Sequence, residues 1–232
     1  MLSSARRLVW VLLLVGGSLA SLIPVASAQE DVQPPPEATI DLVEVTGIID
    51  PPTADYLKAR LAGAQEDGVG AIVIQLDTPG GLDISMREII GEMLDSSVPV
   101  VVWIAPRGAR AASAGTFITY AADLAYMAEA TEIGAASPIN LAEPSSTLDE
   151  KVASDAAAFI RSLAQANGRN EEWAEEAVLE AASISSQEAV EIDVVDGTAS
   201  SLGDLLRVMD GAEADLADGD TATLETWDET AG

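Results

Sequence analysis

The strongest constraint on the fold is a repeated order of buried strands and a helix in the first half of the chain. Residues 71–76 form a short, continuous apolar run, which is the pattern of a strand buried in a parallel sheet. A helical pattern follows over 84–94, with Ile84 on its expected buried side, and the next apolar strand covers 98–104. This order predicts an α/β fold built from right-handed crossovers.

The neighbouring segments extend the same pattern. Residues 40–45 alternate between apolar and polar side chains and predict a first strand, and 53–66 predict a helix with Tyr56 on its buried side. Thr147 and Glu150 form a capping box that opens a long helix. Further elements are expected as short strands at 124–127 and 132–135, and as helices at 171–181, 187–191 and 202–209.

The N-terminus has the organisation of an export signal. Arg6 and Arg7 precede an apolar run, and small residues end at Ala28 in an A-x-A pattern. We therefore expect residues 1–28 to be a signal peptide or an N-terminal anchor, followed by a Pro-rich linker over 29–38. Either alternative predicts that the rest of the chain is extracytoplasmic, secreted or membrane-associated.

The composition excludes several kinds of chemistry. The chain has no cysteine and no histidine, which excludes thiolate nucleophiles, Ser-His-Asp triads and histidine-based zinc sites. Its 39 acidic residues against 11 Lys and Arg give a net charge of −28. Such a surface repels nucleic acid, so we expect no nucleic-acid partner.

One serine is surrounded by small residues. Ser113 lies in a run of alanine and glycine between the strand that ends at Ile104 and a segment over 117–122. Small neighbours allow the backbone to approach a second strand or a substrate closely. We interpret Ser113 as a nucleophile on a strand-to-helix turn, and the alternative is a serine that only permits tight packing.

A glycine pair follows the buried strand at 71–76. Gly80 and Gly81 would let backbone N–H groups point at a ligand without a Cβ atom in the way. If Ser113 lies nearby, the N–H groups of Gly81 and Ala114 could form an oxyanion hole. The alternative is an ordinary turn, and the segment lacks the lysine of a phosphate-binding loop.

A serine nucleophile needs a base, and without histidine the candidates are a lysine or a carboxylate. The chain has only two lysines. Lys58 lies in the first helix and is expected to be a surface residue. Lys151 lies in the first turns of a helix, where the dipole disfavours a positive charge. It borders the apolar face that begins at Val152, so we expect it to be partly buried. Asp155 could pair with Lys151 and so favour its charged form. The alternative is that Lys151 is a solvated lysine without a function.

Taken together, these segments resemble the NfeD-type membrane-associated serine proteases of the ClpP/crotonase superfamily. The resemblance covers about residues 39–212 and is carried by 73–82, 111–118, 133–138, 151–156, 160–164, 168–174 and 187–189. It implies a single-domain spiral of ββα units that hydrolyses peptides with a Ser–Lys dyad.

The resemblance also implies roles for individual residues and for partners. Ser113 falls on the nucleophile, Lys151 on the general base, and Gly81 with Ala114 on the oxyanion hole. Gly80 and Leu82 are expected to bind the substrate. Members of the family oligomerise, and some cut apolar segments of a stomatin-like membrane protein. The mechanism requires no metal and no cofactor.

The chain departs from the family pattern at two places. Ser137 occupies a position where many relatives carry a histidine, so no base is available there. Longer relatives continue into membrane helices and a small β-barrel domain, whereas residues 213–232 are expected to be an acidic tail without another core element. The chain is therefore either a short form or part of a longer protein.

The sequence predicts an extracytoplasmic serine endopeptidase that acts on a polypeptide and forms a homo-oligomer of two or more copies. A second hypothesis is a non-catalytic crotonase-like scaffold that binds a membrane protein. A third, an acyl-CoA enzyme, is disfavoured because a strongly acidic chain repels the anionic cofactor.

Overall fold

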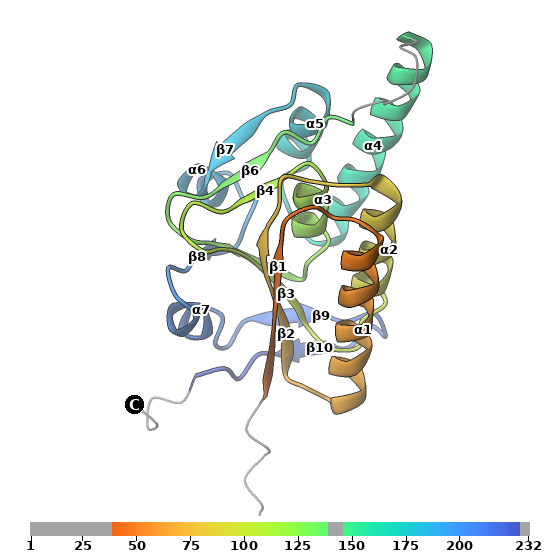
Figure 1. Cartoon of the computed structure of the whole chain (residues 1–232). Helices are drawn as coiled ribbons and strands as arrows, with labels where there is room; N and C mark the ends of the chain where they lie inside the picture. Colours follow the sequence, from red (N-terminus) through yellow and green to blue (C-terminus); the bar gives the residue numbers. More distant parts are fainter. Residues whose placement is uncertain (1–38, 139–145, 228–232) are drawn as a thin grey trace, which may run out of the picture. The chain divides into compact units, whose positions relative to one another are not determined.

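Parallel strands form the centre of the structure, a computed structural model that describes residues 39–138 and 146–227. The order of the main sheet is β1-β2-β3-β5-β8, and all of its neighbouring strands are parallel (Figure 1). These strands are β1 (Ile40–Thr46), β2 (Ala71–Asp77), β3 (Val100–Ile104), β5 (Leu124–Met127) and β8 (Gly197–Thr198). The parallel sheet expected from the apolar runs is confirmed.

A smaller sheet lies beside the carboxyl ends of the main strands. It contains β4 (Arg110–Ala112), β6 (Glu132–Gly134) and β7 (Ser183–Ser185) in the order β4-β6-β7. A parallel bridge between Thr78 and Ala111 joins it to the end of β2. The pairs β3–β4 and β5–β6 each place one strand in each sheet before the next helix, as in the expected ββα units, whereas β1 and β2 lead directly into helices.

Helices cover the two faces of the main sheet unequally. α1 (Pro51–Asp67) and α2 (Asp83–Leu94) lie side by side on one face (Figure 1). The larger core cluster forms there and also takes in α3 (Ala114–Tyr120), α4 (Ser146–Ala166), α5 (Glu171–Leu179) and α6 (Ser186–Glu191). Within the described residues, no helix is both long and apolar enough to cross a bilayer.

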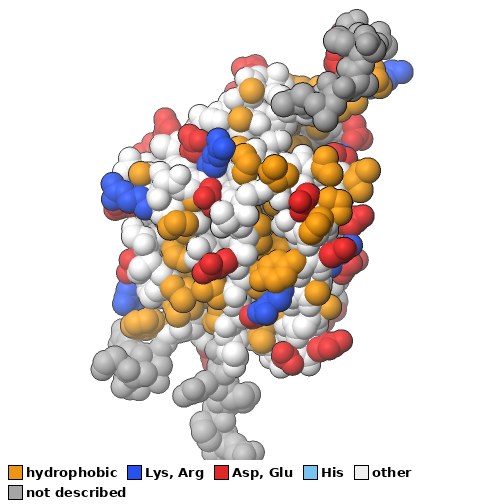
Figure 2. Space-filling view, in the orientation of Figure 1, with side chains coloured by type: hydrophobic (Ala, Val, Ile, Leu, Met, Phe, Trp, Pro, Cys, Tyr) orange, Lys and Arg blue, Asp and Glu red, His pale blue; other side chains and the backbone are white. Residues whose placement is uncertain are grey.

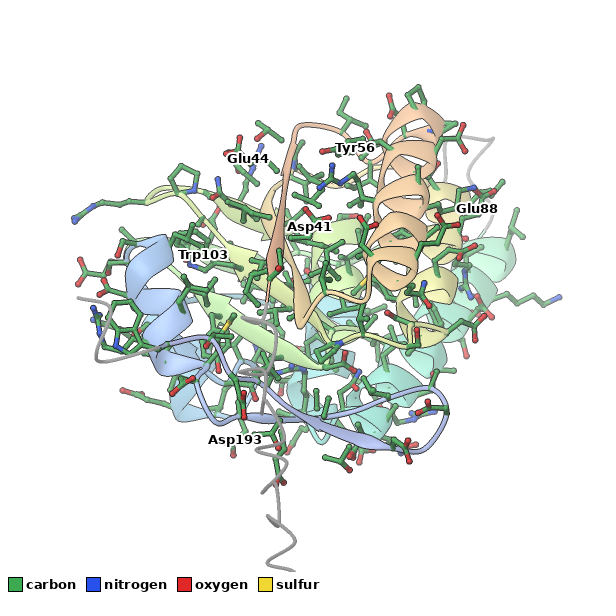
Figure 3. The ribbon with its side chains drawn as sticks, turned by 90° about the horizontal axis from the view of Figure 1, so that it is seen from below. Asp41, Glu44, Tyr56, Glu88, Trp103 and Asp193 are labelled. Atoms are coloured by element: carbon green, nitrogen blue, oxygen red, sulfur yellow. The ribbon has the colours of Figure 1, made fainter. Side chains whose placement is uncertain are left out.

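The other face of the sheet is covered by α7 (Leu202–Val208) and by two short strands. Trp103 lies on this side, near α7 (Figure 3), and its indole N–H donates to the carbonyl of Ala199 at 2.9 Å. The second core cluster gathers around it and includes Leu205 and Met209.

The C-terminal segment differs from the sequence expectation. β9 (Glu213–Asp215) and β10 (Thr221–Thr223) form an antiparallel pair, and Ala214 and Leu224 are buried in the second core cluster. The expectation that no core element follows residue 211 is therefore wrong for residues 213–224. These strands are three residues long and mostly polar, so they carry too little apolar pattern to be recognised.

Local chemistry explains where α1 begins and ends. Asp50 precedes the helix, and its side chain accepts a hydrogen bond from the N–H of Thr53 at 3.0 Å. This bond lowers the pKa of Asp50, because it stabilises the carboxylate. Gly68 ends the helix in the left-handed conformation. Tyr56, expected to be buried, is 45% exposed, because Ala54 occupies the buried side instead (Figure 3).

One carboxyl group is largely buried at the start of β5. Asp123 accepts a hydrogen bond from the N–H of Val100 at 2.7 Å. Burial raises the pKa of Asp123 to about 6, and the nearby charge of Asp215 on β9 adds to this rise, whereas Arg169 opposes it. Folding therefore favours the protonated form of this group.

Acidic side chains outnumber basic ones on the surface. Figure 2 shows many Asp and Glu side chains on one face of the molecule and few Lys or Arg side chains among them. Among the residues that the structure describes, no cluster of three or more potential ligands could hold a metal ion.

Candidate active site

Ser113 occupies a sharp turn between a strand and a helix. It follows β4 directly and precedes α3, with φ 52° and ψ −114°. A positive φ is strained for any residue with a Cβ atom, and such strain is typical of a nucleophile at a strand-to-helix turn. Its N–H donates to the carbonyl of Gly134 at 3.0 Å, which fixes the turn against β6.

The glycine loop touches this turn. Gly80 has φ +113°, and a Cβ atom there would lie 2.6 Å from Cβ of Ser113 and 3.1 Å from its Oγ. Both values are shorter than van der Waals contact, so only glycine allows this approach. The structure therefore brings together the two segments that the sequence analysis selected.

Thr78 connects the loop to the turn, a role that the sequence analysis did not assign. Its hydroxyl accepts from the N–H of Gly80 at 3.0 Å. Its own N–H donates to the carbonyl of Arg110 at 2.7 Å, and its carbonyl accepts from the N–H of Ala112 at 3.0 Å. The side chain is fully buried. A threonine directly after a buried strand could have been recognised as such a connector, because its hydroxyl can satisfy a nearby backbone group.

Two backbone N–H groups beside Ser113 remain available. Ala114 is the first residue of α3, where an N–H group has no partner within the helix. Gly81 lies against Ile49, whose carbonyl would be 2.0 Å from a Cβ atom at this position. Among the described residues, neither N–H donates a hydrogen bond outside a helix or strand. Both groups could therefore bind an anionic oxygen.

Exposed apolar side chains border the glycine loop. Leu82 is 50% exposed, and its N–H donates to the carbonyl of Ile49 at 2.8 Å. Ile48 and Ile84 are also exposed. The expectation that Ile84 is buried is wrong, because Ser85, Met86 and the residues one and two turns further on form the buried face of α2, and Ile84 lies outside that face.

No hydrogen bond joins Lys151 to Ser113 among the residues that the structure describes. Lys151 is exposed on α4 and lines a shallow depression of about 480 Å³ with Glu150, Ser154, Asp155 and Ala158. Among the described residues, neither its amine nor the Ser113 hydroxyl makes a hydrogen bond. The expected partial burial of Lys151 is wrong, because the first turns of α4 extend beyond the neighbouring helices (Figure 1) and leave Val152 38% exposed.

The other positions considered from sequence have structural contacts. Lys58 is a surface residue as expected, and it pairs with Glu88 at 2.8 Å. This pairing raises the pKa of Lys58. The hydroxyl of Ser137 donates to the carbonyl of Val178 at 2.6 Å and thereby ties the end of the β6 segment to α5.

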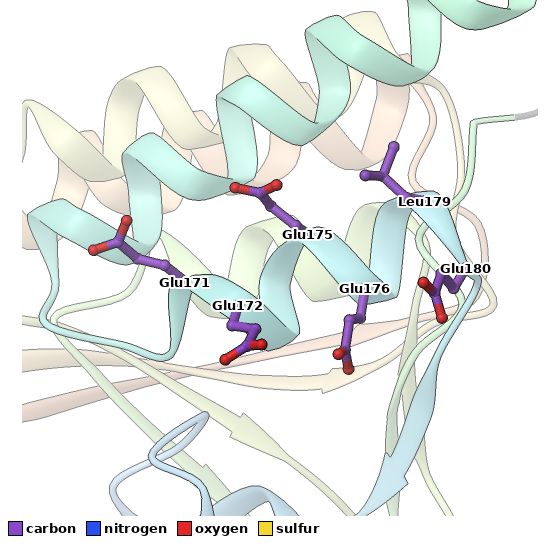
Figure 4. Close-up of a pocket in the computed structure, with 6 residues that line it drawn as sticks. All are labelled: Glu171, Glu172, Glu175, Glu176, Leu179 and Glu180. Carbon is purple, nitrogen blue, oxygen red and sulfur yellow. The ribbon is translucent and has the colours of Figure 1, made fainter.

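An open hollow beside α5 lies apart from these residues. Its volume is about 490 Å³, and five carboxylates dominate its lining (Figure 4). The lining residues are Glu171, Glu172, Glu175, Glu176, Leu179 and Glu180. Neither the serine turn nor the glycine loop contributes to it, so it is not a candidate for the reaction centre.

The amino-acid sequence is similar to one known protein family and to two membrane proteins. The family model described as NfeD1b, N-terminal domain, matches residues 39–218. The membrane-bound protease PH1510 of Pyrococcus horikoshii is 34% identical over 178 residues, which are 75% of this chain and 40% of the relative. The membrane protein NfeD1b of Bacillus subtilis is 25% identical over 192 residues, or 77% of this chain and 43% of the relative. The chain thus spans less than half the length of these relatives.

Solved structures agree with the sequence match. The 1510-N membrane-bound stomatin-specific protease, as a serine-to-alanine mutant, has a TM-score of 0.77 and 31% identity over 83% of this chain and 95% of that chain. Its lysine-to-alanine mutant in complex with a substrate peptide has a TM-score of 0.76 and 32% identity over 82% of this chain and 89% of that chain. The fold is that of these protease domains.

Proposed function

The chain belongs to the NfeD1b N-terminal domain family, and on this premise we propose that it is a serine endopeptidase that uses a Ser113–Lys151 dyad. The observation that carries the proposal is the close approach of Gly80 to Ser113 beside two unused N–H groups. Relatives of the same fold include a membrane-bound protease, and a solved structure of one holds a substrate peptide.

In the proposed mechanism, the neutral amine of Lys151 removes the proton of the Ser113 hydroxyl as its oxygen attacks the peptide carbonyl. The N–H groups of Gly81 and Ala114 bind the oxyanion of the tetrahedral intermediate. Lys151 then gives the proton to the leaving amine. Water, deprotonated in turn by Lys151, attacks the acyl carbonyl, and Lys151 returns this proton to the Ser113 oxygen as the carboxylic acid leaves.

The dyad requires Lys151 to approach Ser113. Catalytic hydrogen bonds are often incomplete before substrate binds and form in the complex. α4 already contacts α3 through Phe159 and Phe117, whose rings stack at 5.9 Å. We expect substrate binding to bring the first turns of α4 toward the serine turn.

The substrate is proposed to be an apolar segment of a polypeptide. Gly80 and Leu82 would line its path, and the exposed side chains of Ile48 and Ile84 make this border apolar. Because a solved relative is called stomatin-specific, the proposed partner is a stomatin-like membrane protein. The protein would act outside the cytoplasm, as a homo-oligomer associated with the membrane.

The proposed domain organisation follows the sequence. Residues 1–28 would direct export as a signal peptide or anchor, and 29–38 would link them to the protease domain that begins at residue 39. N-terminal sequencing of the protein recovered from outside the cytoplasm should begin at Gln29 if the signal is cleaved.

A non-catalytic scaffold is the second candidate, and the exposed position of Lys151 favours it. Such a protein would retain the fold and the glycine loop for binding a membrane protein. It would not need a lysine that reaches Ser113.

Covalent labelling with a fluorophosphonate probe separates the two candidates. An activated serine attacks the probe, so the wild type should be labelled and Ser113→Ala should not. Ser162→Ala, which removes an exposed hydroxyl on α4, should be labelled like the wild type. Absence of labelling in the wild type, or equal labelling of Ser113→Ala, would favour the scaffold.

A further inference from the structure

Arg87 on α2 contacts three side chains, those of Asp83, Asp155 and Phe159. Its Nε donates to both carboxylate oxygens of Asp83 at 3.1 Å. Its terminal nitrogen donates to Asp155 on α4 at 2.6 Å. The guanidinium also lies over the ring of Phe159, 4.2 Å from the ring centre. One side chain therefore holds two helices together through a charge and a cation–π contact.

These contacts join the three elements of the proposed site. α2 directly follows the glycine loop, and its N-cap is Leu82. α3 begins after Ser113 and packs through Phe117 on the ring that Arg87 covers. α4 carries Lys151. Arg87 thus links α2, which follows the glycine loop, to α4, which carries the proposed base.

The partner of Arg87 matters because of its place on α4. Asp155 follows Lys151 by four residues, so the two side chains are neighbours on the helix surface. An ion pair between them would favour the protonated amine, which cannot accept a proton from serine. In the structure, Asp155 pairs with Arg87 instead, although Asp155 lines the same depression as Lys151.

We propose that Arg87 is a positioning residue for the Ser113–Lys151 dyad: it holds Asp155 against α2 and so withholds this carboxylate from Lys151. The inference rests on the proposed function of Lys151 as the base. The charged residues around Lys151 are Asp149, Glu150 and Asp155 on α4 and Asp83 and Arg87 on α2. Replacing Arg87 frees both Asp83 and Asp155, but only Asp155 lies on the same helix as Lys151, one turn away from it.

The chain allows a direct test, because it has only two lysines. In protein labelled with ¹³C and ¹⁵N at lysine, Lys58→Arg removes one signal, and NMR then follows the charge of Lys151 alone through a pH titration. In this background, Arg87→Met keeps a long apolar side chain over Phe159 but frees Asp155. The titration midpoint of Lys151 should rise, because the freed carboxylate of Asp155 can then pair with the amine one helical turn away.

Rescue by a second substitution separates positioning from general destabilisation. Adding Asp155→Asn to Arg87→Met removes the freed carboxylate and should return the midpoint to the wild-type value. An unchanged midpoint in Arg87→Met, or a rise that Asp155→Asn does not reverse, would overturn the proposal.

A matched control removes the effect of net charge. Arg107→Met deletes one positive charge from an exposed pair with Glu129 and should not move the midpoint of Lys151. If Arg107→Met moves it as far as Arg87→Met does, the effect is one of total charge, and the proposal is wrong.

A second readout distinguishes failure of this inference from failure of the proposed function. The rate of fluorophosphonate labelling should rise with pH in the wild type, and Arg87→Met should shift this rise to higher pH by the same amount as the NMR midpoint. A wild type that is not labelled at any pH would contradict the proposed function. The NMR titration would still decide whether Arg87 controls the charge of Lys151.

Discussion

Gly80 approaches Ser113 so closely that a Cβ atom on the glycine would lie 2.6 Å from Cβ of the serine. The two residues are 33 positions apart, and they follow strands of different sheets. Their contact places the glycine loop against the strained serine turn. The proposed reaction depends on this contact, because the oxyanion donor Gly81 directly follows Gly80 in the loop.

Substitution of Gly80 tests this contact. Gly80→Ala forces a Cβ atom into Ser113 and places alanine at φ +113°, so the loop must move. We expect fluorophosphonate labelling to fall by about 100-fold, as when an oxyanion donor is displaced. Gly63→Ala is the control, because nothing lies within 4 Å of its new Cβ atom, and its labelling should equal that of the wild type. Normal labelling of Gly80→Ala would show that the contact is dispensable.

The Thr78 hydroxyl is expected to hold the loop in place. Thr78→Val keeps the shape of the side chain but leaves the buried N–H of Gly80 without its acceptor, at a cost of about 1–3 kcal/mol. Urea unfolding should show this loss, and labelling should decrease. Thr119→Val removes a buried hydroxyl bond within α3 and should destabilise the fold without slowing labelling. Equal labelling of the two variants would contradict the assigned role.

Ser113 should limit stability through its backbone conformation. Glycine tolerates φ 52° and ψ −114°, whereas alanine keeps the strain. We therefore expect Ser113→Gly to be more stable than Ser113→Ala by about 1 kcal/mol in urea unfolding, with both variants inactive. If Ser113→Gly is the less stable of the two, the backbone of residue 113 is not strained at this turn.

Asp123 should make stability depend on pH. Its pKa is about 6 in the folded protein and lower when unfolded, so the folded state holds the proton more tightly. Stability from this group is therefore present at low pH and is lost as pH rises from about 4 to about 6, by about 3 kcal/mol at most. Asp123→Asn keeps the acceptor for Val100 and removes this loss. The difference in unfolding free energy between variant and wild type should grow over that window and then level off. A constant difference would show that Asp123 does not titrate this way.

Much of the fold could be predicted from local patterns. The apolar runs at β2 and β3 indicated buried parallel strands. The two segments of the site were found because small residues at strand ends are unusual without a close approach. Those features are local, so a single sequence contains them.

Other features depend on tertiary contacts and could not be predicted. The β9–β10 pair is stabilised by Ala214 and Leu224 against the sheet rather than by a pattern of its own. Lys151 was expected to be partly buried because Val152 is apolar, but apolarity does not show whether a neighbour covers the helix. The partner of Asp155 is a residue 68 positions away, which no local spacing reveals.

The dyad is tested most directly by the rate at which each variant cleaves an internally quenched apolar peptide, measured over a series of pH values. We expect Lys151→Ala and Lys151→Arg to lose about 100-fold or more in rate, because neither side chain can accept the serine proton. Lys58→Ala should stay within about twofold of the wild type, and Ser113→Ala combined with Lys151→Ala should be little worse than either alone. Wild-type activity should rise with pH. If Lys151→Ala cleaves the peptide at nearly the wild-type rate, Lys151 is not the base, and the account of the site is wrong.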